Sequence, residues 1–555
     1  MNRIALSLLF LFAATWTRAA DSWPHGAVAS VNPLATDAGV NAMKRGGNAV
    51  DAAIATAITL GVVDGHNSGL GGGCFILIRA KDGTVTAIDG REKAPALATR
   101  DMFLKDGKVD DEASKTGALA SATPGALAAY DLALRKHGKL KLADLVLPAA
   151  EIAENGFAID AIYERKLAAT GDKLKRFEES RKQFFNPDGA PLKKGDMLKQ
   201  PDLAKSLRAI AEHGVEWFYR GAYAAKVDAW MQQNGGLLRK EDFFNYAPAL
   251  REPLRTKYRG HEIIGMPPVS SGGIHVAQIL NMLETCDLAA MSTADRLHVM
   301  AEAMKLAFAD RAFWLGDPDF VKVPRGLIDP DYAKQLAGKI ELTHATTVSG
   351  HGAPPRWDGD VFGKHTTHLS AADAEGNWVA MTQTINTAFG SKVIVPGTGI
   401  LLNDEMDDFS VAPGVPNAFK LVGAEANAVA PGKRPLSSMS PTIVVKDGKP
   451  IMSVGAAGGP TIITQTLQAI VNVIDFKMDV GEALEQPRIH HQWSPDELKI
   501  ETKAGDAVLA ELEARGHKLD RSSSFGACQA VRWDEATKSF HAAHDPRVPG
   551  KADGW

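Results

Sequence analysis

The stretch that most constrains this 555-residue chain is Gly363-Lys364-His365-Thr366-Thr367-His368-Leu369-Ser370. We interpret Thr366 as a concealed N-terminus that is released when the precursor cleaves itself between His365 and Thr366. A threonine hydroxyl is a poor nucleophile unless a base takes its proton. An N-terminal threonine brings that base with it, because an α-amine has a pKa of about 7.7–8.0.

Two other interpretations of the octapeptide stand beside this one. Threonine is β-branched and common in strands, so the stretch taken alone is better explained as the start of a strand. A zinc site at His365 and His368 is weaker, because side chains three apart in a strand point to opposite faces. No cysteine or carboxylate stands at ligand spacing beside them, and we expect no metal. The Thr366 hypothesis therefore depends on the rest of the chain.

Composition excludes several classes of function. The chain is 45% hydrophobic and 23% charged, with a formal net charge of −4 and no large block of one sign. These values are ordinary for a globular protein, and nothing indicates a nucleic-acid surface. Length alone allows two to four domains.

Residues 1–20 have the pattern of a secretory signal peptide. Arg3 is followed by an almost wholly apolar run over 4–14, and small residues at 17–20 offer a cleavage site. No later stretch reaches the roughly 18 apolar residues of a membrane helix. No cysteine follows the apolar run to carry a lipid anchor. The sequence predicts an exported protein, periplasmic or secreted, without a membrane anchor.

The three cysteines are Cys74, Cys286 and Cys528. So few in an exported protein of this size do not make a disulfide scaffold, and the odd number leaves at least one free thiol. Cys74 lies within Gly-Gly-Gly-Cys-Phe-Ile-Leu-Ile, which predicts a buried strand and a tight glycine turn before it.

Helical patterns dominate the first half of the chain. Residues 33–46 and 48–63 predict two helices separated by Gly46-Gly47, and 125–245 is mostly helical. Two further helices are expected at about 274–288 and 293–313. Arg91 follows a strand predicted at 84–89, a position where binding residues often lie, although this segment alone favours a surface arginine.

Strand patterns dominate after residue 366, beyond a loop-like, exposed stretch at 340–363. A strand at 377–386 would place Thr382, Thr384 and Asn386 on one polar face. A hairpin is expected over 442–454, turned by Asp447-Gly448.

A helix is expected from Pro460 to about Phe476, preceded by Gly458-Gly459. Backbone N–H groups at such a helix start suit a developing oxyanion. A plain glycine turn is equally compatible with this segment.

Taken together, five motifs resemble the γ-glutamyltranspeptidase family of N-terminal nucleophile (Ntn) hydrolases, and the likeness runs from Gly46 to Arg547. The motifs are Thr366-Thr367-His368, Arg91-Glu92-Lys93-Ala94-Pro95, Met406-Asp407-Asp408-Phe409, Arg434-Pro435-Leu436-Ser437-Ser438-Met439-Ser440-Pro441 and Gly458-Gly459. Each motif alone is weak, and the five together are strong.

The resemblance implies a role for each matching residue. A γ-glutamyl group carries an α-carboxylate and an α-ammonium, so its site needs one cationic and one anionic clamp beside a nucleophile. The carboxylate would be bound by Arg91, whose guanidinium suits a planar anion, with the hydroxyls of Ser437 and Ser438. The remaining implied roles are ammonium binding by Glu405, Asp408 and Asn386, orientation of the Thr366 hydroxyl by Thr384, and an oxyanion hole from Gly458 and Gly459.

The implied reaction transfers a γ-glutamyl group through an ester on Thr366 to water or to an amino acid or peptide, with glutathione as a typical donor. The implied fold is a four-layer αββα sandwich, α/β in class, without a metal or cofactor. The same hydroxyl would first attack the His365 carbonyl. The expected organisation is a signal peptide (1–20), a large subunit (21–365) and a small catalytic subunit (366–555), which pair as a heterodimer.

Two positions depart from the pattern of bacterial relatives. Phe419 stands in the expected lid where most carry tyrosine, and a phenyl ring makes no hydrogen bond to close the lid. Glu405 is glutamine in some relatives, and glutamate adds charge toward the ammonium. Two rival functions are an acylase on the same fold, whose acyl group lacks the α-ammonium, and a periplasmic binding protein without chemistry. The ammonium clamp argues against the first, and Thr366 with Thr384 against the second.

Overall fold

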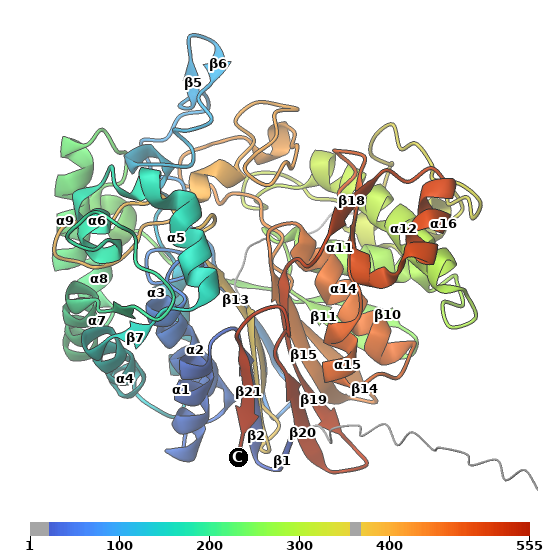
Figure 1. Ribbon diagram of the computed structural model, residues 1–555, viewed down its shortest axis with the longest axis horizontal. Helices are drawn as coiled ribbons and strands as arrows, with labels where there is room; N and C mark the ends of the chain where they lie inside the picture. The colour runs from blue at the N-terminus through green and yellow to red at the C-terminus, as the bar shows by residue number, and fades with distance from the viewer. Residues whose placement is uncertain (1–20, 356–367) are drawn as a thin grey trace, which may run out of the picture.

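Two seven-stranded antiparallel sheets face each other in this computed structural model, which describes residues 21–355 and 368–555 (Figure 1). Sheet A has the strand order β1 (Ser22–Trp23), β20 (Ser539–Ala543), β19 (Ala527–Asp534), β15 (Lys449–Ala457), β14 (Thr442–Lys446), β11 (His261–Gly265) and β10 (Leu254–Tyr258). Sheet B has the order β21 (Lys551–Gly554), β2 (Gly26–Ser30), β12 (His368–Asp373), β13 (Trp378–Thr384), β3 (Gly73–Arg79), β4 (Val85–Gly90) and β9 (Ala249–Arg251).

Helices cover the outer face of each sheet (Figure 1). Sheet B is covered mainly by α1 (Pro33–Lys44), α2 (Ala49–Val63) and α3 (Ala126–His137), with α4 (Leu142–Asn155) and α7 (Pro201–His213) outside them. Sheet A is covered by α11 (Ser271–Leu283), α14 (Thr461–Ile474) and α15 (Val480–Glu485), with α12 (Thr293–Trp314), α13 (Pro330–Ala337) and α16 (Asp506–Ala514) beyond. The expected four-layer αββα sandwich is confirmed.

The remaining elements complete the described chain. They are β5 (Leu104–Lys105), β6 (Lys108–Val109), β7 (Phe157–Ala158), β8 (Met197–Leu198), β16 (Ile489–His490), β17 (Leu498–Glu501), β18 (Leu519–Ser522), α5 (Ala161–Leu174), α6 (Glu178–Phe184), α8 (Glu216–Tyr219), α9 (Ala222–Gln233), α10 (Lys240–Phe244) and the 3-10 turns η1 (Ala118–Ala120), η2 (Arg325–Ile328), η3 (Glu405–Asp408), η4 (Glu425–Asn427) and η5 (Thr502–Ala504). No described helix is long and apolar enough to cross a bilayer.

Both sheets mix strands from before and after the undescribed segment 356–367. In sheet B, β12 and β13 lie between β2 and β3, and in sheet A, β14 and β15 lie between β11 and β19. Each sheet is therefore complete only when both parts of the chain are present.

The first two helices formed where the sequence predicted them. Asn48 begins α2 with a capping box, in which its side chain accepts from the N–H of Asp51 and the Asp51 carboxylate accepts from the N–H of Asn48. The helix is rich in alanine because α1 packs very closely on it: a methyl group added at Gly39 would lie 2.3 Å from Thr56 Oγ1.

Several predicted boundaries differ from the structure. Helix α11 begins at Ser271, so Gly272 and Gly273 belong to its first turn and not to a loop. A methyl group at Gly272 would lie 2.2 Å from the Met439 carbonyl oxygen, so glycine here permits close packing. Strand β13 ends at Thr384, and Asn386 has left the strand with a φ of 74°. Helix α14 begins at Thr461, one residue after Pro460.

The Asp447-Gly448 hairpin is confirmed between β14 and β15, with φ of 49° and 76° at the two turn residues. Cys74 is a buried strand residue as expected, and all three cysteines are unpaired thiols.

The layer between the sheets is apolar at its centre and polar at one end. The central apolar side chains include Phe75, Leu77, Trp378, Ile264, Ile443, Val531 and Phe540. Toward the start of β12, His368 and Ser370 replace them; Ser370 accepts a hydrogen bond from Ser453 of sheet A at 3.0 Å, and the His368 ring packs on Gly455. This polar end is where the chain enters β12.

Gly455 tests this packing. A methyl group there would lie 2.4 Å from His368 Nδ1, so Gly455→Ala should lower the free energy of unfolding by about 1–3 kcal/mol through overpacking. Gly481→Ala is the control, because its methyl group meets no atom nearer than 4.0 Å and alanine favours helices. The apparent midpoints of thermal unfolding should fall for the first variant only; equal midpoints would contradict the packing.

Candidate active site

The site lies at the polar end of the inter-sheet layer, beside the start of β12. His368 pairs with Thr382 across β12 and β13, and its Nδ1 lies 3.1 Å from Thr382 Oγ1. Burial lowers the pKa of His368 to about 3, so the imidazole is neutral and braces the strands. Thr366, the expected nucleophile, and the expected cleavage point lie outside the described residues.

Thr384 ends β13 on the same face as Thr382 and is buried. Its Oγ1 accepts a hydrogen bond of 2.7 Å from the backbone N–H of Asn386, which leaves the hydroxyl proton available to donate. The Asn386 side-chain NH₂ donates to the Asp404 carbonyl at 2.9 Å. Because the NH₂ group is already used, the carboxamide oxygen is the atom of Asn386 that could bind a cation.

Arg91 is fully buried, contrary to the surface position that its segment alone favours. Its guanidinium forms ion pairs with Glu405 and with Asp408, the latter at 2.7 Å. The Nε donates to the Pro435 carbonyl at 3.2 Å, and Glu92 lies 3.4 Å from Nη1. One arginine therefore joins the 91–92 corner after β4, the η3 turn and the 435–438 segment.

Asn403 fixes the η3 turn against the glycine-rich corner before β3. Its Oδ1 accepts from the backbone N–H groups of Ala122 and Glu405, and its NH₂ donates to the carbonyls of Gly71 and Ala122. A buried amide that is satisfied at both ends holds the turn in one position.

The cluster places three acidic side chains around one guanidinium in a dry environment. Burial raises the pKa of Glu92 to about 7 and that of Asp408 to about 6, while Arg91 opposes both shifts. Burial also raises the pKa of Glu405 well above its ordinary value. Burial disfavours the charge of Arg91, but the surrounding carboxylates outweigh it and raise the pKa of the guanidinium.

Arg311, on α12, faces the same region with few partners. It is fully buried, and its Nε donates to Ser271 Oγ at 3.3 Å. Burial lowers its pKa to about 9, and the nearby Asp408 opposes that shift.

Ser437 and Ser438 follow Pro435, whose carbonyl accepts from Arg91, and no described residue satisfies their hydroxyls. Both residues are completely buried, and neither Oγ has a hydrogen-bond partner among the described residues. The backbone is held instead, because Ser271 donates from its N–H and its Oγ to the Ser437 carbonyl. Unpaired buried hydroxyls are costly, so two adjacent ones are a natural place for a ligand's acceptor atoms.

Gly458 and Gly459 form the turn between β15 and α14, with φ of 131° and 59°. A methyl group at Gly459 would lie 2.6 Å from the Phe419 ring, and one at Gly458 would lie 2.7 Å from Thr461 Oγ1. No acceptor in the described ranges takes a hydrogen bond from the N–H of either glycine. Two backbone donors at a helix N-terminus suit an oxyanion.

Direct contacts join Arg91 to Glu405 and Asp408, and Thr384 to Asn386. Asn386 is linked to this cluster through Asp404, the neighbour of Glu405, and Ser437 and Ser438 are linked to it through Pro435. Gly458 and Gly459 adjoin Phe419, in the loop whose Asn417 donates to Asp408. Sequence reasoning assigned no role to Glu92, Arg311 or Asn403. Glu92 was visible as a neighbour of Arg91 in its motif. Nothing in the local pattern marks the other two, because their partners are distant in sequence.

One group of possible metal ligands lies elsewhere, among His298, Glu302 and His517. His298 Nδ1 is already 2.7 Å from His517 Nε2, and the Lys305 ammonium is 2.8 Å from Glu302. Lys305 thus supplies the cation that balances Glu302.

An αββα sandwich with this polar inter-sheet end is the architecture of the Ntn hydrolases. The family model for gamma-glutamyltranspeptidase matches residues 35–555. The "Glutathione hydrolase proenzyme" of Escherichia coli (strain K12) is 48% identical over 531 residues, covering 94% of this chain and 90% of that protein. The chain belongs to the γ-glutamyltranspeptidase family.

Two solved structures extend the comparison. A cephalosporin acylase from Bacillus halodurans superposes with a TM-score of 0.86 at 29% identity, covering 99% of both chains. A Helicobacter pylori gamma-glutamyltranspeptidase gives a TM-score of 0.55 at 40% identity, covering 56% of this chain and 90% of that one. The fold is thus shared by enzymes that act on different acyl groups.

The raised pKa of Glu92 predicts a pH effect on stability. In the unfolded chain a glutamate titrates near 4.5, and in the fold Glu92 titrates near 7, so the folded state binds more protons between these values. Its contribution to stability is present at low pH and is lost as the pH rises toward 7 and beyond. Relative to Glu92→Gln, the native protein should lose urea resistance from pH 5 to pH 8; a constant difference would contradict the shift.

Proposed function

We propose that this protein is a γ-glutamyltransferase and glutathione hydrolase that works through an N-terminal threonine. The observation that carries the proposal is the buried cluster of Arg91 with Glu405 and Asp408. A cation and two anions beside Thr384 offer complementary partners for the carboxylate and the ammonium of a γ-glutamyl group.

The ion pairs within the cluster explain how such a zwitterion is accepted. When the α-carboxylate binds Arg91 and the hydroxyls of Ser437 and Ser438, it replaces the acidic partners of the guanidinium. The α-ammonium of the substrate meanwhile binds Glu405, Asp408 and the carboxamide oxygen of Asn386. Every buried charge keeps an opposite partner in both states, which avoids the large cost of an unpaired buried ion.

The proposed nucleophile is the hydroxyl of Thr366, two residues before β12 in the sequence. Its own α-amine accepts the hydroxyl proton, and Thr384, at the adjacent end of β13, donates its free hydroxyl proton to orient the attacking oxygen. The Thr366 oxygen bonds to the γ-carbonyl carbon, and the N–H groups of Gly458 and Gly459 receive the developing oxyanion.

Collapse of the tetrahedral intermediate breaks the carbon–nitrogen bond. The α-ammonium of Thr366 returns its proton to the leaving amine, and a γ-glutamyl ester remains on Thr366. Water, or the amine of an amino acid or peptide, then attacks the ester carbonyl and gives a proton to the α-amine of Thr366. The ester bond breaks, and this proton restores the Thr366 hydroxyl. No metal or cofactor takes part in these steps.

We also propose that the precursor cleaves itself between His365 and Thr366 into subunits of residues 21–365 and 366–555. The relatives named proenzymes support processing, as does the H. pylori chain, which matches only 56% of this one. Strands from both parts interleave in both sheets, so the subunits would stay together as a heterodimer. Residues 1–20 would direct export to the periplasm or beyond.

Phe419 bears on the fate of the ester. Its ring packs against Gly459, which brings the 411–430 loop over the oxyanion turn. The Phe419 side chain carries no hydroxyl that could donate a hydrogen bond across the site, so we expect water to compete well with acceptor amines.

A donor comparison separates this function from that of an acylase. Wild-type enzyme should hydrolyse a γ-glutamyl anilide at least about 10²-fold better in kcat/KM than the glutaryl anilide, which lacks the α-ammonium. Asp408→Asn should remove most of that preference by lowering turnover of the γ-glutamyl donor alone.

Asp407→Asn is the matched control, because Asp407 lies in the same turn but bonds Ser114 and the N–H of Ala418. Asp407→Asn should change kcat/KM for the γ-glutamyl and the glutaryl donor by the same factor. A wild-type preference for the glutaryl donor would favour the acylase function instead.

Thr366→Ala should abolish both self-cleavage and turnover, since both need the hydroxyl. Thr366→Ser keeps a hydroxyl and should still yield two chains, as intact mass spectrometry of the purified proteins would measure. Two chains from Thr366→Ala would show that another residue performs the cleavage.

A further inference from the structure

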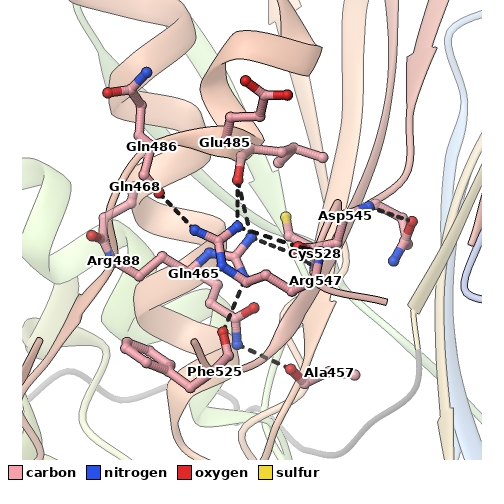
Figure 2. Close-up of polar contacts among 12 residues, drawn as sticks. Ala457, Gln465, Gln468, Glu485, Gln486, Arg488, Phe525, Cys528, Asp545 and Arg547 are labelled. Carbon is pink, nitrogen blue, oxygen red and sulfur yellow. Dashed lines mark hydrogen bonds and ion pairs between the residues drawn. The ribbon is translucent and has the colours of Figure 1, made fainter. Parts of the chain in front are cut away.

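The turn that carries Gly458 and Gly459 is held by two side chains of α14, those of Gln465 and Thr461. The Gln465 NH₂ donates to the carbonyl of Ala457, immediately before the two glycines, at 3.0 Å (Figure 2). It also donates to Thr461 Oγ1, two residues after Gly459, at 2.8 Å. The Thr461 hydroxyl in turn donates to the Gly458 carbonyl at 2.8 Å. Gln465 and Thr461 thus close a ring of three hydrogen bonds around the turn.

The direction of these bonds fixes the orientation of the amide. The Thr461 hydroxyl donates its only proton to the Gly458 carbonyl, so the hydroxyl oxygen must accept from Gln465. The Ala457 carbonyl also needs a donor. Both contacts therefore require the NH₂ end of the amide, and a carboxylate at this position would supply neither.

A glycine just before β19 of sheet A leaves room for the Gln465 amide. Gly526 precedes β19, and a methyl group there would lie 2.1–2.3 Å from the amide atoms of Gln465. The preceding residue, Phe525, is fixed by Arg488, which donates to its carbonyl at 3.0 Å and forms an ion pair with Asp545 (Figure 2). Gln465 is 1% exposed, so the amide sits in a rigid, dry slot.

We propose that Gln465 is a positioning residue for catalysis: it holds the Gly458-Gly459 turn so that the two N–H groups point at the developing oxyanion. This inference rests on the proposed function. Neither glycine has a side chain that could fix the turn. A glycine backbone adopts many conformations unless neighbouring groups restrain it. An oxyanion hole contributes to rate only when its donors are held in place before the reaction.

The cost of loosening the turn follows from the same principle. Removing one oxyanion donor costs about 10²–10³ in kcat, and a displacement of about 1 Å costs on the order of 10². Loss of the Gln465 restraint leaves the donors present but less well placed. We therefore expect a 10- to 100-fold fall in kcat for acylation.

The test compares Gln465→Met with Gln468→Met. Methionine keeps the length of glutamine and removes the donors. Gln468, one turn along α14, is the matched control: it is buried and donates to the carbonyls of Thr464 and Ile489, away from the oxyanion turn. The readouts are kcat and KM for a γ-glutamyl anilide, the Kd of L-glutamate, and the Ki of a boronic acid that carries the α-amino acid group.

The boronate forms a tetrahedral adduct on the nucleophile and places an oxygen where the oxyanion lies, whereas glutamate reports the donor clamp. Gln465→Met should lower kcat and weaken boronate binding by the same 10- to 100-fold, with KM and the glutamate Kd within twofold of wild type. Gln468→Met should keep wild-type kinetics after correction for the folded fraction.

Thr461 supplies a second, independent pair. Thr461→Val removes the hydroxyl link and should reproduce the kinetic loss, while Thr461→Ser should restore it; this pair decides the matter if Gln465→Met fails to fold or to mature. Wild-type kcat in Gln465→Met, or a glutamate Kd that weakens as much as the boronate Ki, would overturn the inference and leave the proposed function standing. Absence of γ-glutamyl turnover in the wild-type enzyme would overturn both.

Discussion

The guanidinium of Arg91 is the point on which the site depends. It is completely buried and holds carboxylates that lie more than 300 positions away in sequence, at Glu405 and Asp408. Charges removed from water this thoroughly are tolerated only when opposite partners surround them. The corner after β4, the η3 turn and the 435–438 segment must therefore meet at one place, where one guanidinium lies against two carboxylates.

Close backbone approach is the second constraint, and it explains much of the glycine in the site. Gly272 lets α11 pack on the segment that carries Ser437 and Ser438, and Gly455 lets sheet A reach the His368 ring. The second of these contacts draws the two sheets together at the polar end of the layer. Because each sheet mixes strands from both sides of residues 356–367, a cut there would leave the site assembled.

Sequence patterns predicted what local physics decides. The capped helix at Asn48, the hairpin at Asp447-Gly448 and the glycine turn before α14 follow from short-range rules. The roles of Arg91 and the two serines came from resemblance to a family, since Arg91 alone looks like a surface residue. The partners of Arg311 and Gln465 were not predictable, because hydrogen bonds between distant segments leave no periodic trace, and Gln465 reads as an ordinary helix residue.

The most direct test of this account is a crystal structure of the processed protein with L-glutamate bound. The account predicts that the Arg91 guanidinium leaves Glu405 and Asp408 to bind the α-carboxylate together with Ser437 and Ser438. The two acids would then contact the α-ammonium. Glutamate bound elsewhere, with the Arg91 ion pairs intact, would contradict the idea that the buried cluster is the donor site.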